Sequence, residues 1–339
     1  MREQKPYYGA LDLARLYCAL LIVVIHMGFG NSLSLVPCLT RQGVPFFFLA
    51  SGFFLSKKLR KSPNIMKTTT QYLKPLLIAF VLWNLLWAPS IVSEYSRLYA
   101  GSPLKIAAVL VRRFFAAGIA PYWFLLVLAE GTLLLALIIR YRKYILGMVL
   151  CVSGIVLSIL YSYQAKYDST GLVYRVFYSV FSWNNNVIMS GFPLLYLGAL
   201  FDMSEERLQK SCFWMVLPLY AISIFAAFLV YRMDEDLFFI PFGVIQAILL
   251  FHLCVVPVPF LQHLPEKICK SARDLSSVMF LTHTVFLTIL GNVFHLWDSL
   301  LRYGITVLCA IFLFLLARKL DYAVLSALLL MKHHSFRGG

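Results

Sequence analysis

Arg15 and His26 lie inside the first long apolar stretch of the chain, and their residue types suit a cationic anchor and a proton-transfer group. The eleven helical steps between them turn through about 1100°, which is three full turns and about 20°. Both side chains therefore lie on one helical face, about 16 Å apart along the axis. Asp12 shares this face, one turn before Arg15. Ionisable groups inside a hydrophobic span cost about 2.5–3.5 kcal/mol unless they face a partner or a watery cavity, so these residues indicate a lined site.

The composition shows what kind of protein must position these residues. Of the 339 residues, 61% are hydrophobic and 13% are charged, and the mean hydropathy is +0.80. These values exclude an ordinary soluble domain and predict an all-α, polytopic membrane helical bundle. We expect about ten transmembrane helices. The predicted segments are residues 8–30, 42–56, 75–93, 121–139, 144–163, 187–201, 213–231, 238–257, 276–296 and 299–317.

The distribution of basic residues predicts that both termini face the cytoplasm. With ten spans this orientation puts 20 Lys and Arg residues inside and nine outside, and leaves Arg15 in the membrane, which accounts for all 30. The loop over residues 57–74 gives the strongest signal, since it carries six basic residues and no acid. We expect one membrane domain over residues 1–320 and a short cytoplasmic tail over 321–339.

The formal net charge of +15 follows the sidedness of the membrane, and no soluble basic module carries it. We therefore expect contacts with membrane lipids and no binding of nucleic acid. The sequence also contains no zinc-ligand spacing of the HExxH or CxxC kind, no phosphate-binding glycine motif and no GxSxG nucleophile motif. A metal site and a serine nucleophile thus have no sequence support.

A set of motifs in a fixed order extends the pattern of Asp12, Arg15 and His26 along most of the chain. Further along stand residues 44–54 (VPFFFLASGFF), Lys74 with Pro75, 122–125 (YWFL), 192–200 (FPLLYLGAL) and 275–283 (LSSVMFLTH). In this combination the sequence resembles the acyltransferase 3 family of integral-membrane acyltransferases.

The resemblance implies an O-acetyltransferase type of enzyme that takes an acyl group, usually acetyl, from cytoplasmic acyl-CoA. The acceptor is a hydroxyl of an envelope glycan or a similar molecule, and a bacterial plasma membrane is implied by the family alone. Arg15 would hold the CoA phosphates near the cytoplasmic face, and the 16 Å to His26 is of the same scale as the arm that carries a CoA thioester. The sequence does not decide between a monomer and a homo-oligomer.

We assign His26 as the general base, because histidine is the side chain most easily held near its working pKa. Glu130, a carboxylate deep in its predicted span, would orient His26 or another cationic group, or contact the acceptor. The alternative for His26 is a histidine that hydrogen-bonds a neighbouring helix. The alternative for Arg15 is a side chain that extends to lipid phosphate.

Four further residues are candidates for acyl-CoA binding, each with a simpler alternative. Ser51 would otherwise pack helices together, and Lys58 and Lys74 would otherwise only set the topology. Trp123 would otherwise belong to the aromatic belt of the membrane interface.

Three more residues are expected to support the site. Asp12 would pair with Arg15, and Ser276 and His283 lie seven residues apart on one helical face within the late motif. The alternative for His283 is an interhelical hydrogen bond.

A transporter of a small amino acid such as serine remains the main alternative function, because the membrane domain of the racemases of vancomycin-resistance systems resembles the same family. A transporter predicts a continuous polar path and paired repeats, whereas the only acids predicted in the membrane are Asp12 and Glu130. A non-catalytic scaffold would not require Arg15 and His26 on one face. The acyltransferase therefore explains the pattern best.

Overall fold

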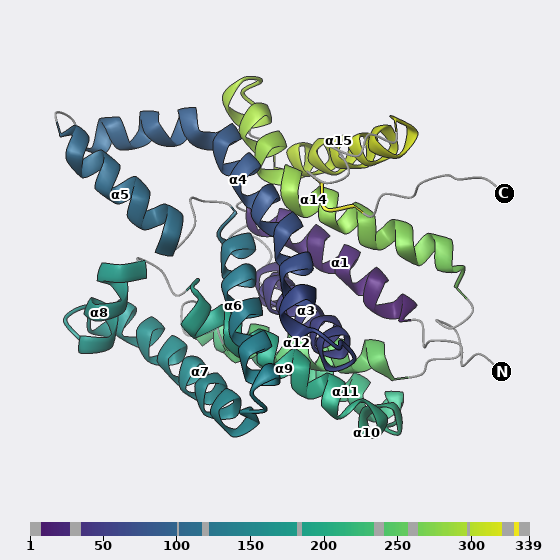
Figure 1. The fold of residues 1–339 in the computed structure, drawn as a ribbon. Helices are drawn as coiled ribbons and strands as arrows, with labels where there is room; N and C mark the ends of the chain where they lie inside the picture. The colour runs from purple at the N-terminus through teal and green to yellow at the C-terminus, as the bar shows by residue number, and fades with distance from the viewer. Residues whose placement is uncertain are drawn as a thin grey trace. The chain divides into compact units, whose positions relative to one another are not determined.

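The computed structural model describes residues 8–27, 35–99, 102–116, 122–181, 185–233, 241–256, 264–296, 299–320 and 329–331. These residues form helices and no strand, which confirms the all-α prediction for the described part (Figure 1). Seven of the helices are long and apolar enough to cross a membrane, and the chain is a multi-pass membrane protein. Each of the ten predicted segments overlaps a helix, but the count of ten crossings and the orientation stay predictions.

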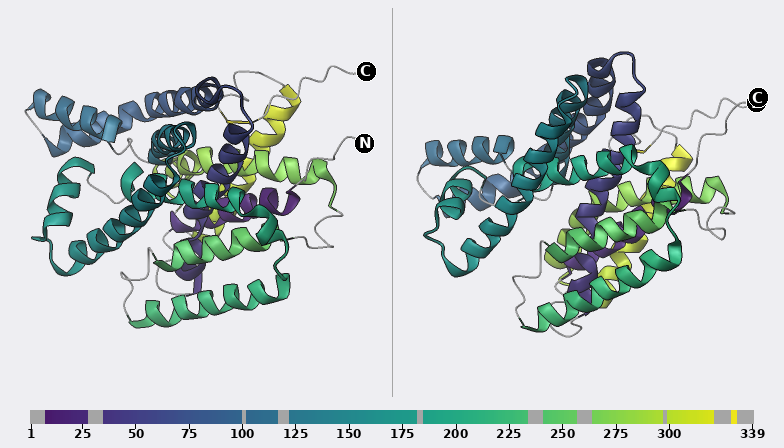
Figure 2. Two further views of the ribbon diagram at one scale, coloured as in Figure 1. Left: turned by 60° about the horizontal axis from the view of Figure 1, so that its bottom comes forward. Right: turned by 90° about the horizontal axis from the view of Figure 1, so that it is seen from below.

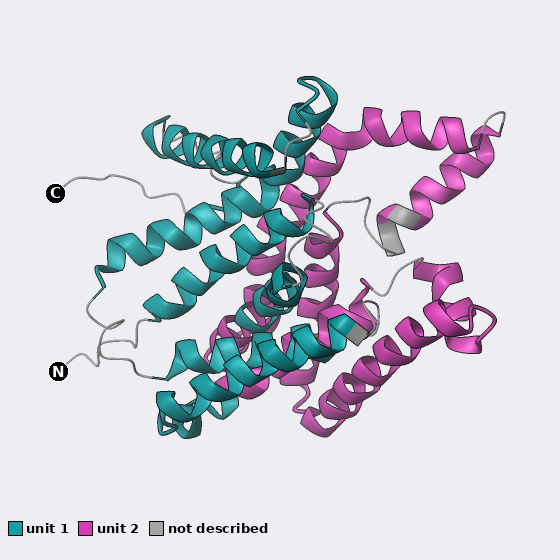
Figure 3. Ribbon diagram, turned by 180° about the vertical axis from the view of Figure 1, so that it is seen from behind, with its two compact units in different colours: residues 1–50, 203–339 teal, residues 51–202 magenta. Residues whose placement is uncertain are grey.

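The chain divides into two compact units, residues 1–50 with 203–339 and residues 51–202 (Figure 3). Helix α3, Gly43–Arg60, runs from the first unit into the second. The prediction of one domain over 1–320 followed by a tail stays a prediction, since residues 321–328 and 332–339 of that tail lie outside the described residues.

The first unit is organised around α1, Gly9–Ile25, and α14, Glu266–Asn292, which lie side by side in Figure 1 and in the further views of Figure 2. The two helices are parallel, because Asp12 meets Arg273 near one end and His26 meets His283 near the other. Two membrane spans are parallel when an odd number of spans lies between them in the chain. Seven predicted segments lie between the first and the ninth, so the predicted order also makes α1 and α14 parallel. The other helices of this unit are α2 (Leu35–Thr40), α10 (Glu205–Gln209), α11 (Phe213–Met233), α12 (Pro241–Val255) and α15 (Ser299–Leu320).

Small side chains let these helices pack closely. Ala19 and Val23 of α1 form a buried apolar cluster with Met279 of α14 and Ala310 of α15. Association inside a bilayer gains little from the hydrophobic effect and depends on such close van der Waals packing. This cluster separates the polar end of the α1–α14 pair from its histidine end.

The second unit contains α4, Ile65–Leu98, which starts at an Asn64 cap whose side chain accepts a hydrogen bond from the Lys67 amide. At 34 residues α4 is about 51 Å long, well beyond the roughly 30 Å hydrocarbon core. The remaining helices are α5 (Pro103–Ala116), α6 (Trp123–Arg140), α7 (Tyr144–Tyr167), α8 (Leu172–Phe181), the π-helix η1 (Val187–Gly191) and α9 (Phe192–Met203).

Two predicted features differ from the structure. The short helices α5 and α8 lie between predicted membrane segments, at places where the sequence analysis names no helix. The ninth span, predicted from residue 276, belongs to a helix that starts ten residues earlier at Glu266. The helices α5 and α8, of 14 and 10 residues, are shorter than the roughly 20 residues that a span needs. The charged residues at the start of α14 lower its hydropathy without breaking the helix, so a hydropathy criterion starts this element too late.

Gly52 fixes the approach of α3 to α9 within the second unit. A Cβ atom built on Gly52 would lie 2.0 Å from the Leu195 carbonyl oxygen. The helix backbones therefore approach as closely as only glycine permits.

We predict that Gly52→Ala destabilises the protein by about 1–3 kcal/mol, because a backbone shift must relieve the overlap with the Leu195 carbonyl. Gly304→Ala in α15 is the matched control, since no heavy atom lies within 4 Å of its added Cβ. Thermal unfolding of both variants in detergent measures the difference. Equal midpoints for the two variants would contradict the close approach.

Candidate functional site

One end of the α1–α14 pair carries a network of paired charges. The Asp12 carboxylate is buried, and its two oxygens face two guanidinium groups. Arg15 Nη1 lies 3.5 Å from Asp12 Oδ1, and Arg273 Nη1 lies 3.9 Å from Asp12 Oδ2. The predicted pairing of Asp12 with Arg15 is therefore present, and Arg273 completes it from α14. Two arginines and the buried carboxylates of Asp12 and Asp274 thus meet at this end of the helix pair.

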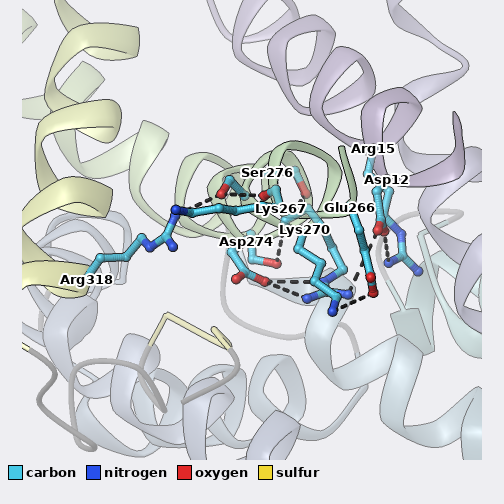
Figure 4. Close-up of polar contacts among 11 residues, drawn as sticks. Asp12, Arg15, Glu266, Lys267, Lys270, Asp274, Ser276 and Arg318 are labelled. Carbon is cyan, nitrogen blue, oxygen red and sulfur yellow. Dashed lines mark hydrogen bonds and ion pairs between the residues drawn. The ribbon is translucent and has the colours of Figure 1, made fainter. Parts of the chain in front are cut away.

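Further ionic side chains lie on the first half of α14 (Figure 4). Lys270 Nζ lies 2.6 Å from Glu266 Oε1 in an exposed pair one turn apart. The Arg318 guanidinium of α15 donates to the Ser271 hydroxyl at 2.8 Å. Lys267 is exposed on the same stretch. This end of the first unit thus gathers cations around a few acids.

The structure gives Ser276 a local role. Its buried hydroxyl donates a 2.6 Å hydrogen bond to the Arg273 carbonyl of its own helix. The hydroxyl is therefore directed back along α14, away from His283 seven residues later.

The other end of the helix pair brings His26 and His283 together. Their ring centroids are 5.1 Å apart, with the planes tilted by 36°. His26 is exposed at the last turn of α1, whereas His283 is 3% exposed. The lone histidine of the sequence pattern is in fact one of a pair.

Hydrogen bonds determine the tautomer of His283. Its Nδ1 lies 2.8 Å from the Phe280 carbonyl oxygen and 3.1 Å from the Met279 carbonyl oxygen. Because a carbonyl oxygen only accepts, Nδ1 carries the proton and Nε2 has a free lone pair. Nε2 is buried and has no hydrogen-bond partner within the described residues. A buried acceptor without a donor costs free energy, so a donor is expected there when the site is occupied.

The remaining predicted residues belong to the second unit. Ser51 is half-buried on α3, Lys58 is exposed at the end of that helix, and Lys74 is exposed on α4. Trp123 and Glu130 are half-buried on α6, two turns apart. In the described part of the chain, no basic side chain forms an ion pair with Glu130. Each unit is defined by its own contacts, so the predicted relation of Glu130 to His26 stays a prediction.

The second unit also holds polar contacts that the sequence analysis did not find. Asp202 of α9 accepts a 2.7 Å hydrogen bond from Ser56 and lies 3.1 Å from Arg60 Nη1, which ties the basic end of α3 to α9. At the start of α6, Tyr122 accepts a hydrogen bond from Trp87 Nε1 at 3.1 Å and stacks on Trp83.

Only weak signals in the sequence pointed to these contacts. Arg273 precedes the predicted ninth span by three residues and was counted as a topology charge. Asp202 follows the FPLLYLGAL motif and looks like an ordinary helix-end acid. Asp12, which contacts Arg273, and Ser56 and Arg60, which contact Asp202, are distant in the chain, so local pattern alone could not find these contacts.

No group of three or more His, Cys, Asp or Glu residues suited to a metal ion occurs within the described ranges. The polar groups available at the α1–α14 pair are guanidiniums and carboxylates at one end and imidazoles at the other. Such groups can bind an anion at the first end and transfer a proton at the second.

A comparison with protein families gives one match, to a family described as an acyltransferase domain, over residues 8–319. The matched range begins before Asp12 and ends within the last residues of α15. No curated protein and no solved structure matches the chain.

We predict that Asp12→Asn destabilises the protein by about 1–3 kcal/mol, because two partly buried guanidiniums lose their shared countercharge. Glu266→Gln, which removes a carboxylate that is 58% exposed, should change stability by no more than about 0.5 kcal/mol. Unfolding of both variants in detergent measures the effect. An equal, small change for both would contradict a structural role for the Asp12 pairing.

Proposed function

Because the chain belongs to the acyltransferase 3 family, a family of membrane acyltransferases, we propose that it transfers an acetyl or other acyl group from cytoplasmic acyl-CoA to a hydroxyl of an envelope glycan or similar acceptor. The observation that supports this most directly is the arrangement of α1 with α14. An end with two arginines around Asp12 and an end with two histidines are built on the same two helices, with an apolar cluster between them.

Arg15 binds the phosphates of the donor in this proposal. In the orientation with both termini inside, Arg15 lies near the cytoplasmic face, where acyl-CoA is available. A guanidinium suits phosphate because its planar fork of N–H donors matches two phosphate oxygens. The extended arm of CoA then brings the thioester along α1 to the histidines, about 16 Å away.

His26 acts as the general base. The acceptor oxygen attacks the thioester carbonyl carbon while His26 takes the hydroxyl proton. The new C–O bond forms and the C–S bond breaks. The protonated histidine then gives its proton to the departing CoA thiolate. His26 is exposed and so can be reached by a substrate hydroxyl. Direct transfer needs no acyl-enzyme.

His283 positions this base. Its Nδ1–H is held by backbone carbonyls, its Nε2 is a buried acceptor, and its ring centroid lies 5.1 Å from that of His26. An acceptor at that place favours an N–H of His26 directed toward it, which leaves the other His26 nitrogen as the base.

Residues of the second unit contribute through the family motifs that they carry. Lys58 and Lys74 supply positive charge for the donor, and Ser51 and Trp123 line its binding site. Glu130 orients a cationic group or contacts the acceptor. Each of these roles is tested by its own substitution in the same assays.

We expect acetyl-CoA to bind the purified, detergent-solubilised protein in a saturable way. The dissociation constant should rise about tenfold or more in Arg15→Ala, because a charge-assisted contact to phosphate is lost. Isothermal calorimetry measures this, and thermal unfolding identifies any variant that fails to fold. If the folded wild-type protein does not bind acetyl-CoA, the acyltransferase proposal fails and transport of serine becomes the function to test.

His26→Ala should retain acetyl-CoA binding and lose acyl transfer by a factor of about 10² to 10⁴, as expected for removal of a general base. His295→Ala is a suitable control, since it changes an exposed histidine outside the helix pair. The assay follows release of CoA in membranes that contain the acceptor. Full transfer activity in His26→Ala would overturn this assignment.

A further inference from the structure

Two guanidinium groups from different helices approach opposite oxygens of one buried carboxylate. Arg15 comes from α1 and Arg273 from α14, and both meet Asp12 at 3.5 and 3.9 Å. These separations exceed the 2.7–2.9 Å or so of a good charge-assisted hydrogen bond. Asp12 therefore brings the two arginines together without holding either of them tightly.

The guanidinium of Arg273 is held by a different acid. Its Nε and Nη2 both lie 3.2 Å from Asp274 Oδ1, and Asp274 is buried. This contact fixes the plane of the guanidinium, whose Nη1 lies 3.9 Å from Asp12 Oδ2. Arg273 thus has a set orientation, which lowers the entropy cost of binding an anion there.

Both arginines remain accessible to a ligand. The side chains of Arg15 and Arg273 are 16% and 19% exposed, whereas the Asp12 side chain is 7% exposed. The two side chains that carry guanidinium groups are therefore more exposed than the carboxylate that they share. Lys270, one turn before Arg273, is paired with Glu266 at 2.6 Å, so these two side chains add no net charge to this surface.

We propose that Arg273 is the second arginine of an anion clamp that binds the phosphate groups of the acyl donor together with Arg15. The proposal rests on the proposed function, since it takes the donor to be a nucleotide thioester. Phosphates carry more charge and more acceptor oxygens than the single Asp12 carboxylate, so they compete well for two guanidiniums that already converge. Asp12 and Asp274 are positioning residues, which set the spacing of the pair and the plane of Arg273.

The clamp explains why the network joins these two helices in particular. α1 carries His26 and α14 carries His283, so a donor bound by both arginines is aligned with the helix pair that carries both histidines. A single arginine would hold the phosphates but would leave the direction of the arm free.

The experiment compares Arg273→Gln with wild type and with Arg318→Gln in calorimetric titrations with acetyl-CoA at several salt concentrations. Glutamine keeps a hydrogen-bond donor for Asp274 but has no charge. Arg318→Gln removes a neighbouring cation whose guanidinium contacts Ser271 instead of Asp12. We expect the dissociation constant to rise about tenfold or more in Arg273→Gln, with a weaker dependence on salt, and to change less than about twofold in Arg318→Gln.

The variant Arg273→Lys distinguishes an effect of lost charge from an effect of altered structure. It should recover part of the affinity, because a lysine restores the charge without the guanidinium fork. A folded Arg273→Gln that binds like wild type, while Arg15→Ala binds weakly, overturns the clamp and leaves the proposed function intact. A loss of affinity with an unchanged salt dependence also overturns it, since the loss then comes from altered structure. If wild-type protein does not bind acetyl-CoA, the proposed function fails and the clamp with it.

Discussion

The structure of the first unit depends on the pairing of charge within an apolar chain. A carboxylate as buried as Asp12 is costly unless cations accompany it, and here the cations come from two helices. This requirement fixes the position of α14 along α1, because Arg273 must reach Asp12. Once that register is set, His283 lies beside His26 at the far end. The ion pairs at one end thus determine which histidines meet at the other.

Between these two ends α1 and α14 pack through a buried apolar cluster to which α15 also contributes. Ala19, Met279 and Ala310 allow close packing and add no polar group. The paired charges and the histidine pair therefore lie at the two ends of α1 and α14. This arrangement fits a long substrate with a charged head and a reactive tip. It fits less well a compact solute that must cross a continuous polar path. The serine transporter has less support from this arrangement than the acyltransferase.

In the second unit, too, close helix packing and a buried carboxylate hold the helices together. Gly52 lets the α3 backbone contact α9. Asp202 of α9 then accepts a hydrogen bond from Ser56, one turn later along α3, and forms an ion pair with Arg60, two turns later. One close approach and one buried acid thus hold the basic end of α3 in place. The sequence motif around Ser51 and Gly52 is explained in part by this packing, so a contribution of Ser51 to donor binding is additional to it.

The sequence by itself determined the helical class, the membrane environment, the family, and the common face of Asp12, Arg15 and His26, because hydropathy and helical periodicity are local properties. It also identified His283 through the late motif. Only the tertiary structure decided that His283 packs on His26, that Ser276 bonds to its own helix, and that Arg273 shares Asp12 with Arg15. Some 260 residues separate Asp12 from Arg273, and a contact across that distance depends on how the helices pack, which a local pattern does not contain.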